Sequence, residues 1–280
     1  MSEVNNNNTE ITENQEVSAK EVRISEKEAD SFLAERMQGN DKTEKTVDLE
    51  PNATYIVDGE KIKTDDNGDI YSRGGKLLPN ITYELNGNKY VTDENGRIVS
   101  TEAHPTLAPE NTRESVAQKN VGGHDRREND QGGHIVGRDM NGDGGEGNLV
   151  AMDSRVNQSD YKRMENDIKA SCEEGKEVRM KSTFQYEADS ERPSRIDVEV
   201  TTNDEKTIYK FDNDLDNSLL DDVPEEGKDT VKEILDDTKG VISSIKETYD
   251  SEGNLKETVV NITYTNEEGT NSRTKAVIEH

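Results

Sequence analysis

The chain has 280 residues, which is room for one or two domains. Only 28% of the residues are hydrophobic and 4% aromatic, with no Trp, so the composition excludes one core that packs the whole chain, and we expect one modest globular region flanked by poorly packed segments. The formal net charge of −27 disfavours tight binding of long nucleic acid through a broad basic surface, and a single Cys excludes an intrachain disulfide framework.

The first segment, 1–48, is expected to be acidic and largely disordered. Residues 1–22 are rich in Asn, Glu and Thr, and a short helix is predicted from Ser25, because Ser25 and Glu28 form a capping box ahead of an apolar stripe. The segment has neither the basic nor the apolar region of a Sec signal peptide, and no apolar run in the chain could span a bilayer. We therefore expect no membrane contact, and either export by a dedicated secretion system or a cytoplasmic location.

Residues 49–105 contain an internal repeat. The stretches 51–72 and 79–100 align without gaps at an offset of 28, and they share 12 identities in 22 positions. Each unit has two strand-like runs joined by an Asp-Gly or Asn-Gly turn, followed by an Asp-x-Asn-Gly turn. Two copies are fewer than a repeat array needs, so the pattern predicts two β-hairpins that lead into the next domain.

The segment 106–212 holds two polar, glycine-rich loops, at 122–133 and 139–148, with short apolar runs after each. A helix is predicted from Ser159 or Asp160 to Glu174, with Gly175 as its C-terminal stop, and its apolar positions from Tyr161 to Cys172 should face the core. Alternating apolar residues predict the strands that follow, at Val178/Met180, Ile196/Val198/Val200 and Ile208/Phe211.

The last segment, 213–280, begins with an acidic linker. A helix around 225–237 is predicted next, and then a β-meander over 241–249, 258–264 and 273–278. The whole chain is therefore expected to be an α+β protein with a mixed or antiparallel sheet, in which hairpin repeats precede the central domain and a helix and β-meander follow it.

Three residues of the central segment suit hydrolytic chemistry together. His134 follows two glycines, which we expect to turn the backbone sharply and leave the imidazole reachable as a general base. Asn157 and Glu165 are separated by two steps of four residues, so a helix would present both on one side. A neutral Asn ligand leaves a bound cation its full charge for polarising a phosphate, while a carboxylate can orient its waters. Each residue alone has an ordinary structural explanation, and only the joint spacing favours a site.

This joint spacing resembles the DNA/RNA non-specific endonucleases of the ββα-metal fold. The similarity is to the Asp-x-Gly-Gly-His branch that is found in bacterial polymorphic toxin effectors, and it extends over roughly 79–212. The first motif stands here as Asp130-Gln131-Gly132-Gly133-His134. The second motif is met at Asn148, Leu149, Val150, Ser154, Asn157, Tyr161, Met164 and Glu165.

The resemblance implies a ββα-metal nuclease core and a role for each matching residue. His134 would be the general base, Asn157 the direct ligand of Mg²⁺, for which Mn²⁺ can substitute, and Glu165 the carboxylate that holds metal-bound water. Asn148 would complete the catalytic set as the residue that braces it, and Arg192 would contact phosphate. The implied activity is sequence-non-specific hydrolysis of DNA and RNA, in a secreted toxin effector with an immunity protein as its partner.

The sequence departs from the family at Gln131, where an acidic residue is usual, and it lacks the Arg that precedes Gly-His in another branch. Arg126 or Arg127 could supply that cation as a substrate-binding residue, with Lys169 as a further candidate. Two other functions stay open. One is a catalytically inert surface or interaction protein on the same fold, and the other is a Ca²⁺-binding module, because the loop from Asp139 begins like a calcium loop. That loop has Val150 where a calcium loop needs Glu, so we favour a glycine-rich active-site loop.

Overall fold

The computed structural model describes residues 49–57, 59–203 and 205–280, so the disorder and the short helix expected within 1–48 lie outside the described residues. The described chain is an α+β protein, as predicted, and its strand pairs are antiparallel. Its strands form a four-stranded sheet (β1 to β4), a two-stranded hairpin (β8–β9) and a nine-stranded sheet in the order β15-β14-β13-β12-β11-β10-β7-β6-β5. No described helix is long and apolar enough to cross a bilayer.

The two repeat units form hairpins, as the sequence predicts. The first unit contains β1 (Thr54–Val57), β2 (Glu60–Thr64), β3 (Ile70–Arg73) and β4 (Lys76–Leu77), and the second contains β5 (Thr82–Leu85), β6 (Asn88–Thr92) and β7 (Ile98–Ala103). Both units close their Asp-x-Asn-Gly turn in the same way, because the carboxylates of Asp65 and Asp93 each accept hydrogen bonds from two backbone N–H groups of the turn. Because these hydrogen bonds are local, the hairpins of the repeat could be predicted from the sequence.

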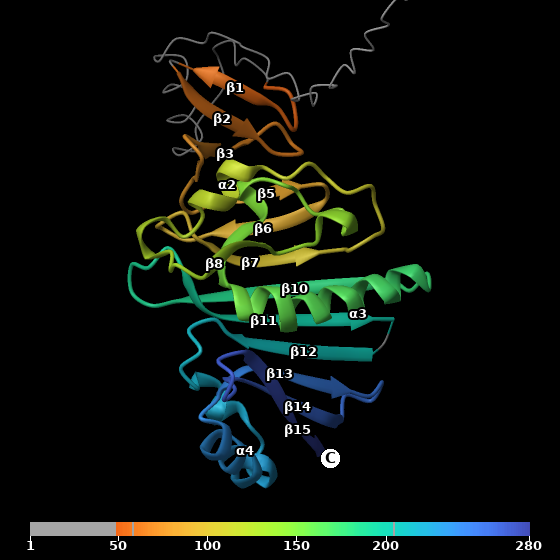
Figure 1. The fold of residues 1–280 in the computed structure, drawn as a ribbon. Helices are drawn as coiled ribbons and strands as arrows, with labels where there is room; N and C mark the ends of the chain where they lie inside the picture. Colours follow the sequence, from red (N-terminus) through yellow and green to blue (C-terminus); the bar gives the residue numbers. More distant parts are fainter. Residues whose placement is uncertain (1–48, 58, 204) are drawn as a thin grey trace, which may run out of the picture.

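The two units occupy different places in the fold. The second unit joins the large sheet through β7, which pairs with β10 (Val178–Tyr186), whereas the first unit keeps a sheet of its own. Figure 1 shows the first unit at one end of the molecule, next to α2 (Ser115–Asn120). The first unit therefore does not simply lead into the central domain, because it packs back onto that domain's loops.

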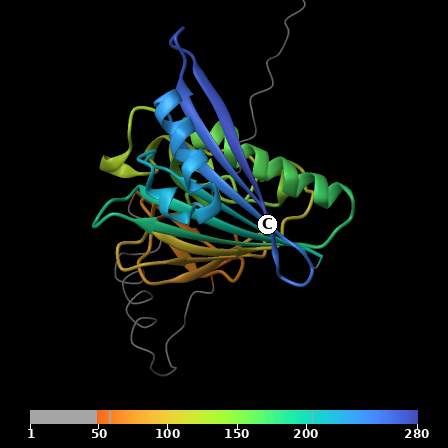
Figure 2. The same ribbon diagram turned by 90° about the horizontal axis from the view of Figure 1, so that it is seen from below.

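The large sheet continues with β11 (Pro193–Thr202), β12 (Glu205–Asp212), β13 (Val241–Tyr249), β14 (Leu255–Thr265) and β15 (Asn271–Glu279). Alternate residues of β10 and β11 are buried on one face, which gives this antiparallel sheet a core face and a solvent face. Figure 2 shows the strong twist between its yellow and blue ends. The domain boundaries at 105 and 212 stay predictions. At each boundary, a strand before it pairs with a strand after it in the same large sheet.

The core face of the sheet carries a β-β-α arrangement. Strands β8 (Asp130–His134) and β9 (Leu149–Asp153) form a hairpin, which a π-helical turn, η4 (Val156–Tyr161), connects to α3 (Lys162–Glu173). Figure 1 shows α3 lying along the middle of the sheet. The predicted apolar stripe is confirmed, since Tyr161, Met164 and Ile168 are buried in the main core, and Gly175 follows the helix with a φ of 75°.

The C-terminal helix and β-meander are also confirmed. Helix α4 (Glu225–Thr238) packs on β14 and β15 and closes a second apolar core, in which Val231 belongs to the same buried cluster as Ile245 and Val260. Short helical turns complete the described structure: η1 (Gly123–Asp125), η2 (Arg138–Met140), η3 (Glu146–Asn148) and η5 (Ser218–Asp222).

Candidate active site

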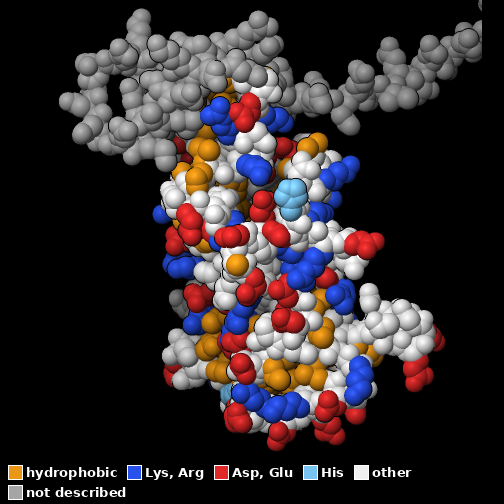
Figure 3. All heavy atoms as spheres, turned by 90° about the vertical axis from the view of Figure 1, so that its left-hand side faces the viewer, with side chains coloured by type: hydrophobic (Ala, Val, Ile, Leu, Met, Phe, Trp, Pro, Cys, Tyr) orange, Lys and Arg blue, Asp and Glu red, His pale blue; other side chains and the backbone are white. Residues whose placement is uncertain are grey.

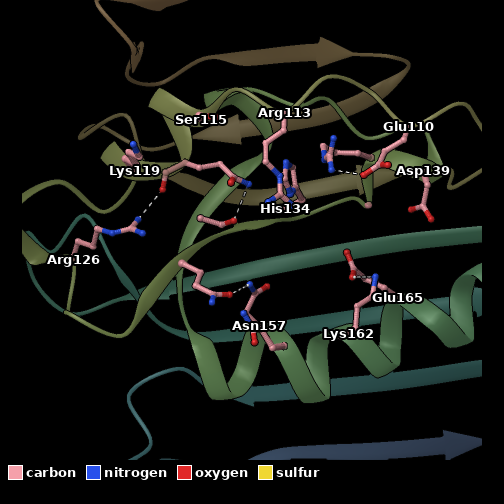
Figure 4. A pocket seen from close by; sticks show the side chains of 16 residues that line it. Glu110, Arg113, Ser115, Lys119, Arg126, His134, Asp139, Asn157, Lys162 and Glu165 are labelled. Atoms are coloured by element: carbon pink, nitrogen blue, oxygen red, sulfur yellow. Dashed lines mark hydrogen bonds and ion pairs between the residues drawn. The ribbon is translucent and has the colours of Figure 1, made fainter. Parts of the chain in front are cut away.

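A pocket of about 750 Å³ lies between α2, the β8–β9 hairpin and the helix that begins at η4. Figure 4 shows that Asn157, Lys162 and Glu165 rise into it from the helix, while His134 and Arg113 face them from the opposite wall. The structure thus brings together three residues that the motif spacing selected: His134, Asn157 and Glu165.

The charge of the pocket is opposite to that of the chain. Five cationic side chains line it against three carboxylates, which gives 5 − 3 = +2 in a chain with a net charge of −27. The cations are Arg113, Lys119, Arg126, Arg138 and Lys162, and the carboxylates are Glu110, Asp139 and Glu165. Figure 3 shows basic side chains scattered among acidic ones on one face of the molecule, rather than gathered into a broad basic surface. Anion binding by this protein is therefore expected to depend on the pocket itself.

His134 stands at the end of β8 with its imidazole half-buried. Its Nε2 atom is buried and has no hydrogen-bond partner among the described residues. Burial, together with the positive charges of Arg138 and Arg113, lowers the pKa of His134 to about 4, although a hydrogen bond with the Gly144 backbone opposes the shift. The ring is therefore neutral at pH 7, and one nitrogen is left without a partner, as a general base requires.

The prediction of a sharp turn before His134 is wrong. Gly132 and Gly133 are extended residues inside β8, and they pair with Ala151 and Val150 of β9. What requires glycine is close approach. A Cβ on Gly132 would lie 2.8 Å from the Cα atom of Gln118 in α2, so the strand could not hold α2 this closely with a larger residue.

Gly133 has the corresponding role toward the helix. A Cβ at this position would lie 2.8 Å from Cε of Met152 and 3.1 Å from Oδ1 of Asn157. The absence of a side chain at Gly133 therefore lets the amide of Asn157 lie directly against the strand that ends in His134. The two glycines of the motif serve packing on both sides of one strand.

Asn157 is oriented by the residue that departs from the family pattern. Its Nδ2 donates a hydrogen bond of 2.8 Å to Oε1 of Gln131, while no described residue donates to its Oδ1. An amide held by its nitrogen presents its oxygen, which is the atom that a hard cation would bind. Gln131 thus keeps an acceptor where the family has a carboxylate, without the negative charge.

Glu165 lies one turn beyond the start of α3. Burial raises the pKa of its carboxyl group, while Lys162, which forms a 3.1 Å ion pair with it, acts in the opposite direction. Asp139 also lines the pocket, and its carboxylate pairs with Lys169 at 2.6 Å. Lys169 is therefore engaged outside the pocket lining, in an ion pair with Asp139.

Asn148 does not line the pocket, and its side chain is fully buried. Its Oδ1 accepts hydrogen bonds from the Val136 backbone N–H and the Tyr90 hydroxyl, and its Nδ2 donates to the carbonyls of Val136 and Asp143. These four bonds join β6, the end of β8 and the glycine-rich loop. Through these bonds, the buried side chain of Asn148 supports the backbone that follows His134.

The three arginines proposed for substrate binding lie in different environments. Arg126 lines the pocket, but its guanidinium donates to the carbonyls of Gln118, Val121 and Asp130. Arg127 lies outside the pocket lining and forms a 2.6 Å ion pair with Asp214.

Arg192 is 3% exposed and also lies outside the pocket lining. Its guanidinium makes two hydrogen bonds to the carboxylate of Asp130, at 2.7 and 3.1 Å, and a third to Asp214 at 2.6 Å. The structure therefore places this arginine in a buried ion-pair network beneath the β8–β9 hairpin, away from His134.

Lys63 was not predicted from the sequence, but the structure connects it to the site through Glu114. Lys63 is 6% exposed, and its Nζ lies 2.6 Å from both Glu114 and Glu146. Glu146 also accepts a 2.6 Å hydrogen bond from the Ser72 hydroxyl. The available signal was weak: Lys63 departs from the repeat, because the second unit has Val91 at the equivalent position.

The pocket residues fit a cation held mainly by water. Among residues 49–57, 59–203 and 205–280, no group of three His, Cys, Asp or Glu side chains could hold a metal. A Mg²⁺ ion keeps several waters, however, and needs few protein oxygens. The unused Oδ1 of Asn157 and the nearby carboxylate of Glu165 provide that donor set.

Residues 79–204 match the family model of the DNA/RNA non-specific endonucleases. This match confirms the resemblance found in the His134 motif. Among curated proteins, the type VII secretion system protein EssD of Staphylococcus aureus strains USA300 and NCTC 8325 is 33% identical over 105 residues. The alignment covers 35% of this chain and 17% of those relatives, so the chain spans less than a fifth of their length.

A solved structure of NucA from Streptococcus agalactiae with magnesium ion bound is also similar. It aligns with 47% of this chain and 72% of its own, at 16% identity and a TM-score of 0.36.

Proposed function

We propose that this protein is a metal-dependent endonuclease that hydrolyses phosphodiester bonds of DNA and RNA without sequence specificity. The observation that carries the proposal is the pocket in which a neutral His134, the free amide oxygen of Asn157 and the carboxylate of Glu165 meet. The family of residues 79–204 supports the same reaction class.

His134 would act as the general base. Its unpartnered Nε2 would accept the proton of a water molecule as that water attacks the phosphorus atom, and the bond to the leaving oxygen would break in line. Because burial and two neighbouring arginines keep the ring neutral, the base is available at neutral pH without a separate deprotonation step.

Asn157 would hold the Mg²⁺ ion through Oδ1, and Glu165 would orient the ion's water shell. When bound, the ion supplies positive charge for the phosphate oxygens and the leaving group, and Mn²⁺ is expected to replace it, since it takes the same oxygen ligands. Gln131 would keep the amide of Asn157 from rotating, because it fixes the nitrogen and leaves the oxygen toward the pocket.

Nothing in this reaction uses the 2′-hydroxyl of the sugar, so DNA and RNA are both expected substrates. We also propose that the protein is a secreted effector with a specific immunity protein. This follows from the name of the relative, a type VII secretion system protein, and from the toxin branch that the motif resembles.

The test is degradation of plasmid DNA and of RNA by the purified chain with Mg²⁺, with Mn²⁺ and with EDTA. We expect cleavage of both substrates with either metal and none with EDTA. His134→Ala and Asn157→Ala should each lower the rate by about 10²–10⁴-fold, while the exposed His104→Ala should leave it unchanged. Wild-type rates in either site variant would refute the mechanism.

A further inference from the structure

The five cations that line the pocket differ in whether their charge is already engaged. Arg126 is held by backbone carbonyls, Arg138 by the Asn111 carbonyl and Glu110, and Lys162 by Glu165. The side chains of Arg113 and Lys119 form no hydrogen bond or ion pair with any described residue. Two unengaged cations in a pocket of net positive charge point to an anionic ligand.

Arg113 is the unengaged cation that faces the catalytic candidate. Figure 4 shows its side chain reaching from the wall opposite α3 toward His134. Its charge is also felt by the imidazole, since it is one of the causes that depress the pKa of His134. The guanidinium is therefore close to the place where a scissile phosphate would lie.

The backbone that carries Arg113 is held in place on both sides. The backbone N–H of Glu114 donates to the Gly144 carbonyl at 3.1 Å, and a Cβ on Gly144 would lie 1.9 Å from the Thr112 carbonyl oxygen. The Glu114 carboxylate is in turn fixed by the buried Lys63 at 2.6 Å. The side chain of Arg113 is therefore exposed and unpaired, whereas its backbone is fixed. A fixed backbone lowers the entropic cost of binding a ligand.

We propose that Arg113 is a catalytic residue that binds the non-bridging oxygens of the scissile phosphate, and that Lys119 binds a neighbouring phosphate of the same strand. The proposal rests on the proposed function and names two substrate contacts for it. An arginine suits the reacting group, because its planar fork of donors matches two phosphate oxygens and its charge opposes the charge that develops on them. Lysine suits the neighbouring phosphate as a point charge.

The kinetic test compares a long substrate with a small one. We expect Arg113→Gln to lower kcat by about 10²–10³-fold on plasmid DNA and on a p-nitrophenyl ester of thymidine monophosphate alike. Lys119→Gln should raise the KM for DNA and leave the small ester unaffected, because the ester has no neighbouring phosphate. Lys181→Gln, an exposed lysine of β10 outside the pocket, is the matched control and should change neither.

Two further measurements separate binding from a structural effect. Guanidinium ions at millimolar concentration should restore part of the activity of Arg113→Gly but none of that of His134→Ala. A variant that had lost its fold would not recover activity in this way. In EDTA, where no cleavage is expected, Arg113→Gln should weaken binding of a short DNA oligonucleotide and reduce the salt slope of binding by about one.

The outcomes also separate this proposal from the proposed function. Wild-type kcat in Arg113→Gln, beside an inactive His134→Ala, would overturn the role of Arg113 and leave the nuclease assignment standing. A wild-type chain that cleaves nothing would overturn the proposed function. In that case equal oligonucleotide binding by wild type and Arg113→Gln would overturn the phosphate contact as well, whereas weaker binding by the variant would support it.

Discussion

Replacing Lys63 with Met removes the cation that Glu114 and Glu146 share, two carboxylates within the residues that match the endonuclease family. Lys63 belongs to β2 of the first repeat unit, outside the residues that match the family, and it pairs at 2.6 Å with both Glu114 and Glu146. Glu146 is 9% exposed, so the variant leaves a buried carboxylate without its cation. Breaking a buried pair in this way costs about 3–5 kcal/mol, and we expect a loss of that size in the free energy of unfolding.

The assay is urea denaturation at pH 7, with Lys61→Met as the matched control. Lys61 lies two positions away on the same strand and is exposed, so its replacement should change the stability by less than about 0.5 kcal/mol. A second variant, Lys63→Met with Glu146→Gln, should recover part of the loss, because the buried group is then neutral. A loss below about 1 kcal/mol in Lys63→Met would refute the reasoning.

The pH dependence of this difference follows from the two shifted groups. Burial opposes ionisation of both, but their attraction prevails: the pKa of Glu146 is lowered and that of Lys63 is raised. The contribution of Glu146 is present above its unfolded pKa and is lost as the pH falls through the lower folded value. The contribution of Lys63 is present below its unfolded pKa and is lost as the pH rises through the higher folded value. The stability difference should therefore be constant at neutral pH and shrink in acid.

Three further predictions concern the site and its support. In metal-free protein, the ring of His134 should titrate by NMR with a midpoint of about 4, and a midpoint near 6.5 would contradict the burial and charge argument. Gly132→Ala should destabilise the protein by about 1–3 kcal/mol in thermal unfolding, because the new methyl group meets the backbone of Gln118; unchanged stability would show that α2 can move away freely. Arg192→Met should cost about 3–5 kcal/mol by leaving Asp130 buried and unpaired, whereas a raised KM at unchanged stability would instead favour a phosphate contact.

The sequence by itself determined the elements whose signals are local. Turn chemistry at Asp65 and Asp93 depends on side chains that bond to backbone two and four residues away, so the repeat predicts its own hairpins. Helical periodicity likewise predicted α3, and Glu165 of this helix lines the same pocket as Asn157 of the preceding turn η4. The candidate site was recognisable because its residues lie within one hairpin and one helix that are close in the chain.

Only the tertiary structure decided which distant groups meet. The extended glycines of β8 are required by neighbours that pack against them, and no local pattern reveals those neighbours. The same holds for Arg192, whose charge is taken up by a carboxylate 62 residues away, and for Lys63, whose partners lie 51 and 83 residues away. A side chain's sequence neighbours specify its backbone conformation, but whether its charge is buried, paired or free for a ligand depends on packing between segments far apart in the chain. For that reason the sequence could predict candidates for the base and the metal ligand, at His134 and Asn157, whereas the unpaired cation at Arg113 became visible only in the folded structure.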